Sequence, residues 1–114
     1  MPDAATGAER GWTFLTNHAH VLLAIARDPT MRLRDVADSV GVTERAAQSI
    51  VADLEAGGYL RRMRVGRRNH YTVNPDGRFR HPAEADQPIG ALLALFTGDT
   101  PRAQLDQVDA EPQR

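Results

Sequence analysis

Arginine side chains are the groups in this chain with the clearest capacity for chemistry, and they gather in one segment. All fourteen basic residues of the 114-residue chain are arginine, and seven of them lie between residues 61 and 80. The same segment holds a single acid, Asp76. A guanidinium group presents a planar fork of N–H donors that matches phosphate and guanine better than an ammonium group does. The segment therefore predicts a surface that binds anionic groups.

The positive charge is local, because the chain as a whole carries a formal net charge of only −1. Residues 81–114 hold six acids against two arginines, Arg102 and Arg114. A basic face and an acidic C-terminal tail follow, so a role in nucleic-acid binding has to rest on this placement of charge. The alternative is that a GC-rich genome, which favours arginine codons, is the main cause of the bias.

The stretch just before the arginines, LRDVADSVGVTERAAQSIVADL from Leu33 to Leu54, has a regular spacing of apolar residues. If Leu33 is position one, apolar residues occupy positions four, eight, ten, fifteen and eighteen, with Ala37 at five and Gly41 at nine. Two helices packed across a tight turn need a small residue where they cross and a glycine at the turn. The spacing predicts a helix-turn-helix, and an ordinary helical hairpin is the alternative.

The second helix of this motif exposes side chains that can read base edges. Its apolar side faces inward at Ala47, Ile50, Val51 and Leu54. In a major groove, arginine pairs with guanine and glutamine with adenine, while hydroxyl groups bind phosphates or base edges. Glu44 could accept from cytosine or serve only the helix dipole. The predicted contacts are Thr43, Glu44, Arg45, Gln48 and Ser49, and a solvated face is the alternative.

The arginine-rich segment itself is typical of a β-hairpin. Strands at about residues 59–65 and 69–74 flank a loop of residues 66–68, after Gly57-Gly58 has ended the preceding helix. The alternation predicts Met63, Val65, Tyr71 and Val73 on the core side, with Arg62, Arg64 and His70 opposite. Such a loop can reach a minor groove or phosphates, although a charge run is usually a solvated face. The residues predicted to contact the DNA backbone or minor groove are Arg34, Arg62, Arg64, Arg67, Arg68, Asn69 and His70.

Further elements complete the expected fold. A helix over about residues 17–27, capped by Thr16 or Asn17, and a short strand over residues 31–33 precede the helices of the motif, at about 34–40 and 43–56. Near the C-terminus, Pro88 fits the first turn of a last helix. An apolar stripe at i, i+3, i+4 and i+7 predicts that this helix makes a dimer contact, or else folds back on its own domain. The predicted dimer residues are Ile89, Leu92, Leu93 and Phe96, with Trp12 and Phe14.

These elements define one domain of the α+β class that is mainly α. We expect a winged helix-turn-helix, made of three helices plus a small antiparallel β-hairpin, with an extra C-terminal helix. The predicted organisation is a flexible leader at residues 1–10, the DNA-binding domain at 11–77, an irregular segment and dimerisation helix at 78–97, and a disordered acidic tail at 98–114.

Several other chemistries are disfavoured. The chain has no cysteine, which excludes disulfides and thiolate metal sites and fits a reducing cytoplasm. His18 and His20 lie two residues apart, so on a helix they point away from one another and cannot share a metal ion. No metal, cofactor or enzymatic activity is predicted, since no paired carboxylates, phosphate loop or nucleophile with its base occurs. We also expect no secretion signal, no membrane span and, at 5% aromatic residues, no single-stranded RNA binding.

The run LRDVADSVGVTERAAQSIVADLEAGGYLRRMRVGRRNHYTV resembles the winged helix-turn-helix of small bacterial transcriptional regulators of the MarR and ArsR kinds. The resemblance covers about residues 12–74. It implies a homodimer on a near-palindromic DNA site, with the helix of residues 43–56 in successive major grooves and the wings at the flanks. The implied reading residues are Arg45, Gln48 and Ser49, and the implied wing residues are Arg67 and Arg68.

The sequence thus predicts a cytoplasmic transcriptional regulator, acting as a repressor, that binds a palindromic double-stranded DNA operator as a homodimer. Two alternatives stay open. The same fold can serve as a protein–protein interaction module. It can also serve as a one-component ligand sensor, with a pocket between the helix of residues 17–27 and the C-terminal helix, near Trp12 and Phe14, and an unknown small-molecule effector.

Overall fold

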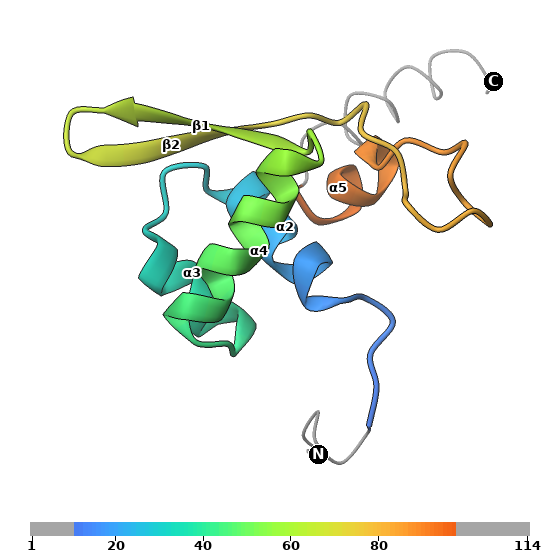
Figure 1. Ribbon diagram of the computed structural model, residues 1–114, viewed down its shortest axis with the longest axis horizontal. Coiled ribbons are helices and arrows are strands. Elements are labelled where there is room, and N and C mark those ends of the chain that lie inside the picture. The colour runs from blue at the N-terminus through green and yellow to red at the C-terminus, as the bar shows by residue number, and fades with distance from the viewer. Residues whose placement is uncertain (1–10, 98–114) are drawn as a thin grey trace, which may run out of the picture.

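The computed structural model describes residues 11–97, so the predicted leader and acidic tail lie outside the described residues. This part of the chain consists of four helices and one two-stranded antiparallel sheet (Figure 1). The hairpin projects past the helices at one end of the molecule, and the last helix packs at the other end. The elements in chain order are α2 (Asn17–Arg27), α3 (Leu33–Val40), α4 (Glu44–Ala56), β1 (Leu60–Val65), β2 (Arg68–Val73) and α5 (Gly90–Thr97).

The core is built around α2, which is apolar on all sides over its middle turns. Residues 21–25 are all buried, and Val21 and Ile25 have no exposed surface. α3, α4, α5 and β2 all contact this helix. As predicted, Thr16 caps it, with the Thr16 hydroxyl accepting from the Ala19 amide at 3.2 Å. The other members of the core include Val36, Ile50, Val51, Leu54, Leu60, Tyr71, Ile89 and Leu93.

The predicted helix-turn-helix is confirmed, including the glycine at its turn and the small residues where its two helices cross. Gly41 has φ 88°, a left-handed conformation that is strained for residues with a Cβ and is readily adopted by glycine. The amides of Gly41 and Val42 both donate to the Ala37 carbonyl, at 2.8 and 3.0 Å, and so close the end of α3. Ala37 and Ala47 are buried, which permits α3 and α4 to approach closely.

The hairpin turn is one residue shorter than expected. Val65 pairs with Arg68 and Leu60 with Val73, so the turn is Gly66-Arg67. Gly66 has φ 62°, and the described residues other than glycine have no positive φ, which is the pattern of a type II′ turn. A loop over residues 66–68 would instead have paired Val65 with Asn69.

The core face that the sequence predicted for the hairpin was therefore wrong for β1, at Met63 and Val65, and right for β2, at Tyr71 and Val73. Opposed residues of an antiparallel pair point to one side of the sheet, so Tyr71 shares its face with Arg62, while Met63 shares its face with His70. Met63 and Val65 are 49% and 48% exposed, whereas Tyr71 is buried. A one-residue change in loop length inverts the parity of one strand relative to the other.

The strand predicted over residues 31–33 was also wrong. The Asp28 carboxylate accepts hydrogen bonds from the amide and the hydroxyl of Thr30. The Met31 amide donates to the Asp28 carbonyl at 3.0 Å. This tight turn uses the backbone groups that a strand would need, and Leu33 already begins α3. The loop reaches the sheet at one backbone hydrogen bond, in which the Tyr71 amide donates to the Pro29 carbonyl at 3.0 Å.

The C-terminal helix begins at Gly90 rather than at Pro88. The two residues before it pair with an earlier part of the chain instead, because the Ile89 amide donates to the Gly77 carbonyl at 2.7 Å and Pro88 forms an isolated bridge with Arg78. α5 then packs on α2, and the Arg27 guanidinium donates to the Phe96 carbonyl at 3.1 Å. Within residues 11–97, no helix has the length and hydropathy needed to cross a membrane.

Candidate nucleic-acid interface

The outer face of α4 carries the polar side chains that the sequence predicted there. Its inner side is buried at Ala47, Ile50, Val51 and Leu54. Because a helix places residues three and four apart on one face, the opposite side forms a continuous polar strip. The side chains exposed on this strip are Thr43, Glu44, Arg45, Gln48 and Ser49.

Thr43 has a structural task in addition to its predicted contact. Its backbone is extended, at φ −72° and ψ 159°, and its hydroxyl accepts from the Ala46 amide at 3.0 Å. This is the geometry of an N-cap, which satisfies one of the free amides of the first turn. Glu44 follows in that turn, where its negative charge is favourable to the helix dipole.

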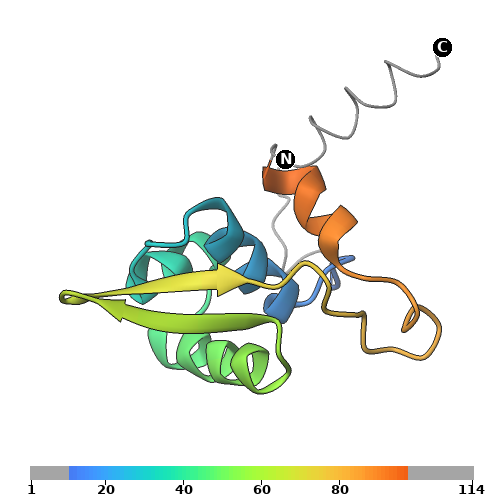
Figure 2. The same cartoon turned by 90° about the horizontal axis from the view of Figure 1, so that it is seen from above.

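The hairpin brings five arginines together without a carboxylate among its own residues. The Gly66-Arg67 turn lies at the end of the molecule opposite α5 (Figure 2). All five arginines are exposed, whereas Asn69 and His70 are half-buried. The basic side chains of residues 61–68 therefore project from one extended arm.

Two of these arginines are committed to partners within the chain. The Arg62 guanidinium forms an ion pair with Glu55 at 3.2 Å, which ties the hairpin to α4. The Arg68 guanidinium donates to the Thr30 carbonyl at 2.6 Å, which ties the hairpin to the loop before α3. Within residues 11–97, Arg61, Arg64 and Arg67 form no ion pair and no side-chain hydrogen bond. Arg34, on the exposed side of α3, forms none there either.

The residues predicted to form a dimer contact are divided by the structure. Ile89 and Leu93 are buried in the core of their own chain, because α5 folds back onto α2, so they offer no interface surface. Leu92 is half-buried, and Phe96 is 41% exposed. Trp12 and Phe14 are 68% and 92% exposed and contact one another edge to face, with ring centroids 5.2 Å apart.

Leu95 is an exposed apolar residue that the sequence analysis missed. It is 73% exposed, next to Phe96 at the end of α5. The apolar run from Leu92 to Phe96 could have indicated it, because a run without polar interruption places apolar groups on both sides of a helix.

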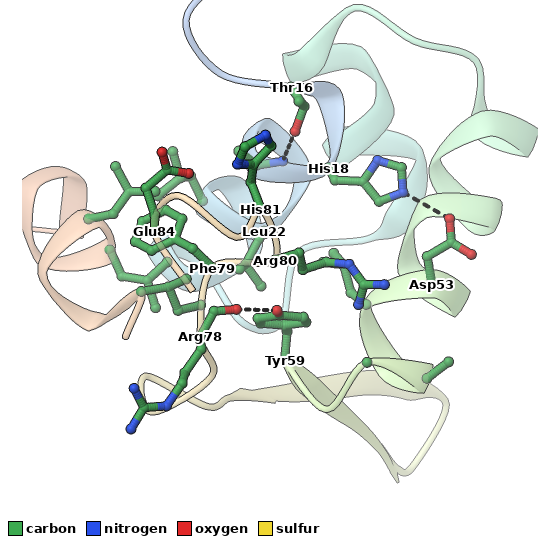
Figure 3. A pocket seen from close by; sticks show the side chains of 18 residues that line it. Thr16, His18, Leu22, Asp53, Tyr59, Arg78, Phe79, Arg80, His81 and Glu84 are labelled. Carbon is green, nitrogen blue, oxygen red and sulfur yellow. Dashed lines mark hydrogen bonds and ion pairs between the residues drawn. The ribbon is translucent and has the colours of Figure 1, made fainter. Parts of the chain in front are cut away.

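A cavity of about 820 Å³ lies between α2, the C-terminal end of α4, the segment before α5 and α5 itself (Figure 3). Its floor is apolar, with Leu22, Phe79 and Leu93 among its lining residues. The sensor pocket was predicted near Trp12 and Phe14, and this cavity contains neither of them. The expected position between α2 and the C-terminal helix agrees with the cavity, but the part lined by residues 78–84 could not be predicted, because these residues have no periodic pattern.

Polar groups surround the mouth of this cavity. His18 and Asp53 are joined at 2.8 Å between Nε2 and Oδ2, and Arg80 lies beside Tyr59 (Figure 3). The Tyr59 hydroxyl donates to the Arg78 carbonyl. Among the described residues, no group of three or more His, Cys, Asp or Glu side chains could hold a metal ion.

The family described as MarR matches residues 13–68, a span that runs from just before α2 to the first residue of β2. The fold is similar to the crystal structure of MepR, a transcription regulator of the Staphylococcus aureus multidrug efflux pump MepA. That similarity has a TM-score of 0.52 and 12% sequence identity, and it covers 93% of this chain and 74% of the other. No curated protein matches the sequence. The predicted winged helix-turn-helix fold and the resemblance to the MarR kind are confirmed, while the likeness to the ArsR kind stays a prediction.

Replacement of Thr43 tests its role as the N-cap of α4. We expect Thr43→Ala to lower the free energy of unfolding by about 1 kcal/mol, because the capping hydroxyl is lost. Thr43→Ser keeps a hydroxyl at the same position and should retain most of the stability. Urea unfolding followed by circular dichroism measures both variants. Equal losses for the alanine and serine variants would contradict the capping role.

Proposed function

We propose that this chain, whose residues 13–68 match the MarR family, is a DNA-binding transcription regulator that binds a specific double-stranded site without chemical turnover. One observation carries the proposal. A helix-turn-helix presents an exposed polar strip on α4, and an arm with five arginines and no acid projects beside it. The strip supplies groups that can read base edges, and the arm supplies groups that bind phosphates.

Arg45 and Gln48 are the best candidates for base contacts. They lie three residues apart in the first two turns of α4, both exposed and on one side of the helix. The N-terminal residues of a recognition helix contact base edges in the major groove. Arginine pairs with guanine through two hydrogen bonds, and glutamine can do the same with adenine. Ser49 and Glu44 flank them and can add a phosphate or cytosine contact.

The hairpin arginines supply affinity rather than sequence preference. Each phosphate that an arginine neutralises releases a counterion, so binding weakens as salt rises. Arg64 and Arg67 have no partner among the described residues and are free to bind phosphate, whereas Arg62 would first have to leave Glu55. We therefore assign the main backbone contacts to Arg64 and Arg67, with Arg34, Arg62, Asn69 and His70 as further candidates.

Sequence preference and general affinity can be separated by two matched substitutions. Arg45→Ala should weaken binding to a selected site about tenfold, because a bidentate guanine contact contributes about 1–3 kcal/mol of discrimination. It should change binding to random duplex DNA far less. Arg67→Ala should weaken both kinds of DNA alike. Selection of bound sequences from random DNA identifies the site, and fluorescence anisotropy measures the affinities. Equal losses on both kinds of DNA for Arg45→Ala would rule out base reading.

We further propose that the regulator is a homodimer, held by the apolar residues that remain exposed at α5 and before α2. In a single chain, four large apolar side chains are 41–92% exposed in these two places: Leu95, Phe96, Trp12 and Phe14. Surfaces of this kind mark interaction sites in proteins. Two-fold symmetry of the protein then requires a palindromic site, with half-sites about one helical turn apart.

Leu95→Ser tests the dimer without removing a core residue. Because Leu95 is already 73% exposed, the variant should fold normally and dissociate at protein concentrations where the parent chain is dimeric. Val65→Ser is the matched control, because Val65 is also exposed but lies on the hairpin. Sedimentation equilibrium measures the mass of each variant. A parent chain that is monomeric at every concentration would contradict the proposal.

We propose that regulation is by repression. A protein bound at its site excludes other proteins from the same DNA, and this mode needs no further contact surface. If the chain binds no duplex DNA even at low salt, the rival function gains support, in which the same fold docks a protein partner.

The cavity favours a second candidate function, a one-component ligand sensor. It is large enough for a small organic molecule and combines an apolar floor with polar groups at the mouth. It also lies against the last turn of α4, from which Leu54 and Ala56 line it. A bound molecule would therefore contact the helix that carries the base-reading strip.

The fluorescent probe 8-anilino-1-naphthalenesulfonate tests this cavity. We expect its fluorescence to rise on the native protein, and the rise to be smaller for Ala19→Phe, which places a ring in the cavity. Ala91→Phe, on α5 outside the cavity, is the control. Saturating probe should change the affinity for the selected DNA site. Binding of the probe with no change in that affinity would reject the sensor.

A further inference from the structure

The loop between α2 and α3 lies along the free edge of β2. β1 occupies one edge of β2, and on the other edge the Tyr71 amide donates to the Pro29 carbonyl at 3.0 Å. One residue further along the loop, the Thr30 carbonyl accepts from the Arg68 guanidinium at 2.6 Å. In Figure 1 this loop rises from the helices to the hairpin. The hairpin is thus fixed to the helix-turn-helix at two adjacent carbonyls.

A hollow of about 290 Å³ opens between this loop and the hairpin turn, and its charged lining is entirely basic. No carboxylate lines it, and the nearby Asp28 carboxylate is occupied by the amide and hydroxyl of Thr30. The charged lining residues are Arg32, Arg67 and Arg68. Like charges that converge without a counterion repel one another, so the hollow favours an anion.

The three arginines have different tasks in this hollow. Arg68 is held by the Thr30 carbonyl, so it joins the two walls and is not free. Arg32 and Arg67 are exposed, stand on opposite walls, and form no ion pair within residues 11–97. The volume is several times the roughly 30 Å³ that one water occupies, which leaves room for a phosphate group.

We propose that this hollow seats one phosphate of the DNA backbone between Arg32 and Arg67, and that Arg68 is the positioning residue that holds its walls together. The inference rests on the proposed DNA-binding function and deepens it. It adds Arg32, which lies at the start of the helix-turn-helix, to the contacts, and it gives Arg68 a task different from that of its neighbour. A single phosphate would then be bound by the helix-turn-helix and the hairpin at once, which fixes how far the hairpin lies from α4.

Salt dependence of binding to the selected duplex tests the contact. Because the slope of log K against log salt counts neutralised phosphates, the loss of both Arg32 and Arg67 should reduce it by about one per protomer, and Arg32→Ala or Arg67→Ala alone should reduce it by no more than that. Arg32→Lys keeps the charge and should keep the slope. Because both side chains bind one phosphate, the double variant Arg32→Ala with Arg67→Ala should lose less affinity than the product of the single losses. The matched control is the double variant Arg61→Ala with Arg67→Ala. Its loss of affinity should equal the product of the two single losses, because Arg61 does not line the hollow.

Hydrogen exchange tests the positioning task independently of DNA. The Tyr71 amide points away from β1, so its protection depends on the Pro29 carbonyl. Arg68→Ala should release the loop and speed exchange at this amide, whereas Arg67→Ala should leave its exchange rate unchanged. Equal exchange in the two variants would overturn the positioning role.

The outcomes separate this inference from the proposed function. If the parent chain binds no duplex at low salt, the DNA-binding function fails and the phosphate seat fails with it. If the parent chain binds its selected site and Arg32→Ala leaves both slope and affinity unchanged, the seat is wrong while the function stands. If the double variant Arg32→Ala with Arg67→Ala loses affinity by the full product of the single losses, the two side chains bind different phosphates. That result would also overturn the proposed phosphate site.

Discussion

The burial of α2 on every side is the constraint on which the rest of the structure depends. Five consecutive residues, 21–25, have almost no exposed surface, so α2 needs a packing partner in each direction. α3 and α4 cover one part of it, the base of the hairpin another, and α5 a third. Because α3, α4, α5 and β2 all pack against the same helix, and β1 joins β2 and α4, the strip on α4 and the arm formed by the hairpin are held in fixed relation to one another.

The parts of the fold that could be predicted are those set by neighbouring residues. The glycine at position 41 and the small residue at 37 define the turn between α3 and α4, since a left-handed backbone and a close helix crossing each admit few residue types. The hairpin was predicted in kind but not in register. Turns of two and three residues containing glycine are both common, and the difference between them decides which side chains of β1 share a face with those of β2.

Contacts between distant segments account for what the sequence could not predict. An arginine count treats all five hairpin arginines alike, yet Glu55 and the Thr30 carbonyl engage two of them from other elements. Leu93 matches the pattern of an interface residue as well as that of a core residue, and the path of residues 75–89 decides between them. The cavity likewise arises where this path crosses α2 and α4, so no single stretch of sequence encodes it.

That same path links the cavity to the hairpin through the Tyr59 ring. A Cβ at Gly77 would lie 2.7 Å from one edge of the ring, and a Cβ at Gly57 would lie 3.0 Å from the other. Tyr59 is therefore seated between two glycines, one after β2 and one at the end of α4. Its amide donates to the Leu54 carbonyl at 2.9 Å, and its carbonyl accepts from the Asn74 amide at 2.9 Å. Since Tyr59 also lines the cavity, a molecule bound there would contact the residue whose backbone joins the end of α4 to the base of the hairpin.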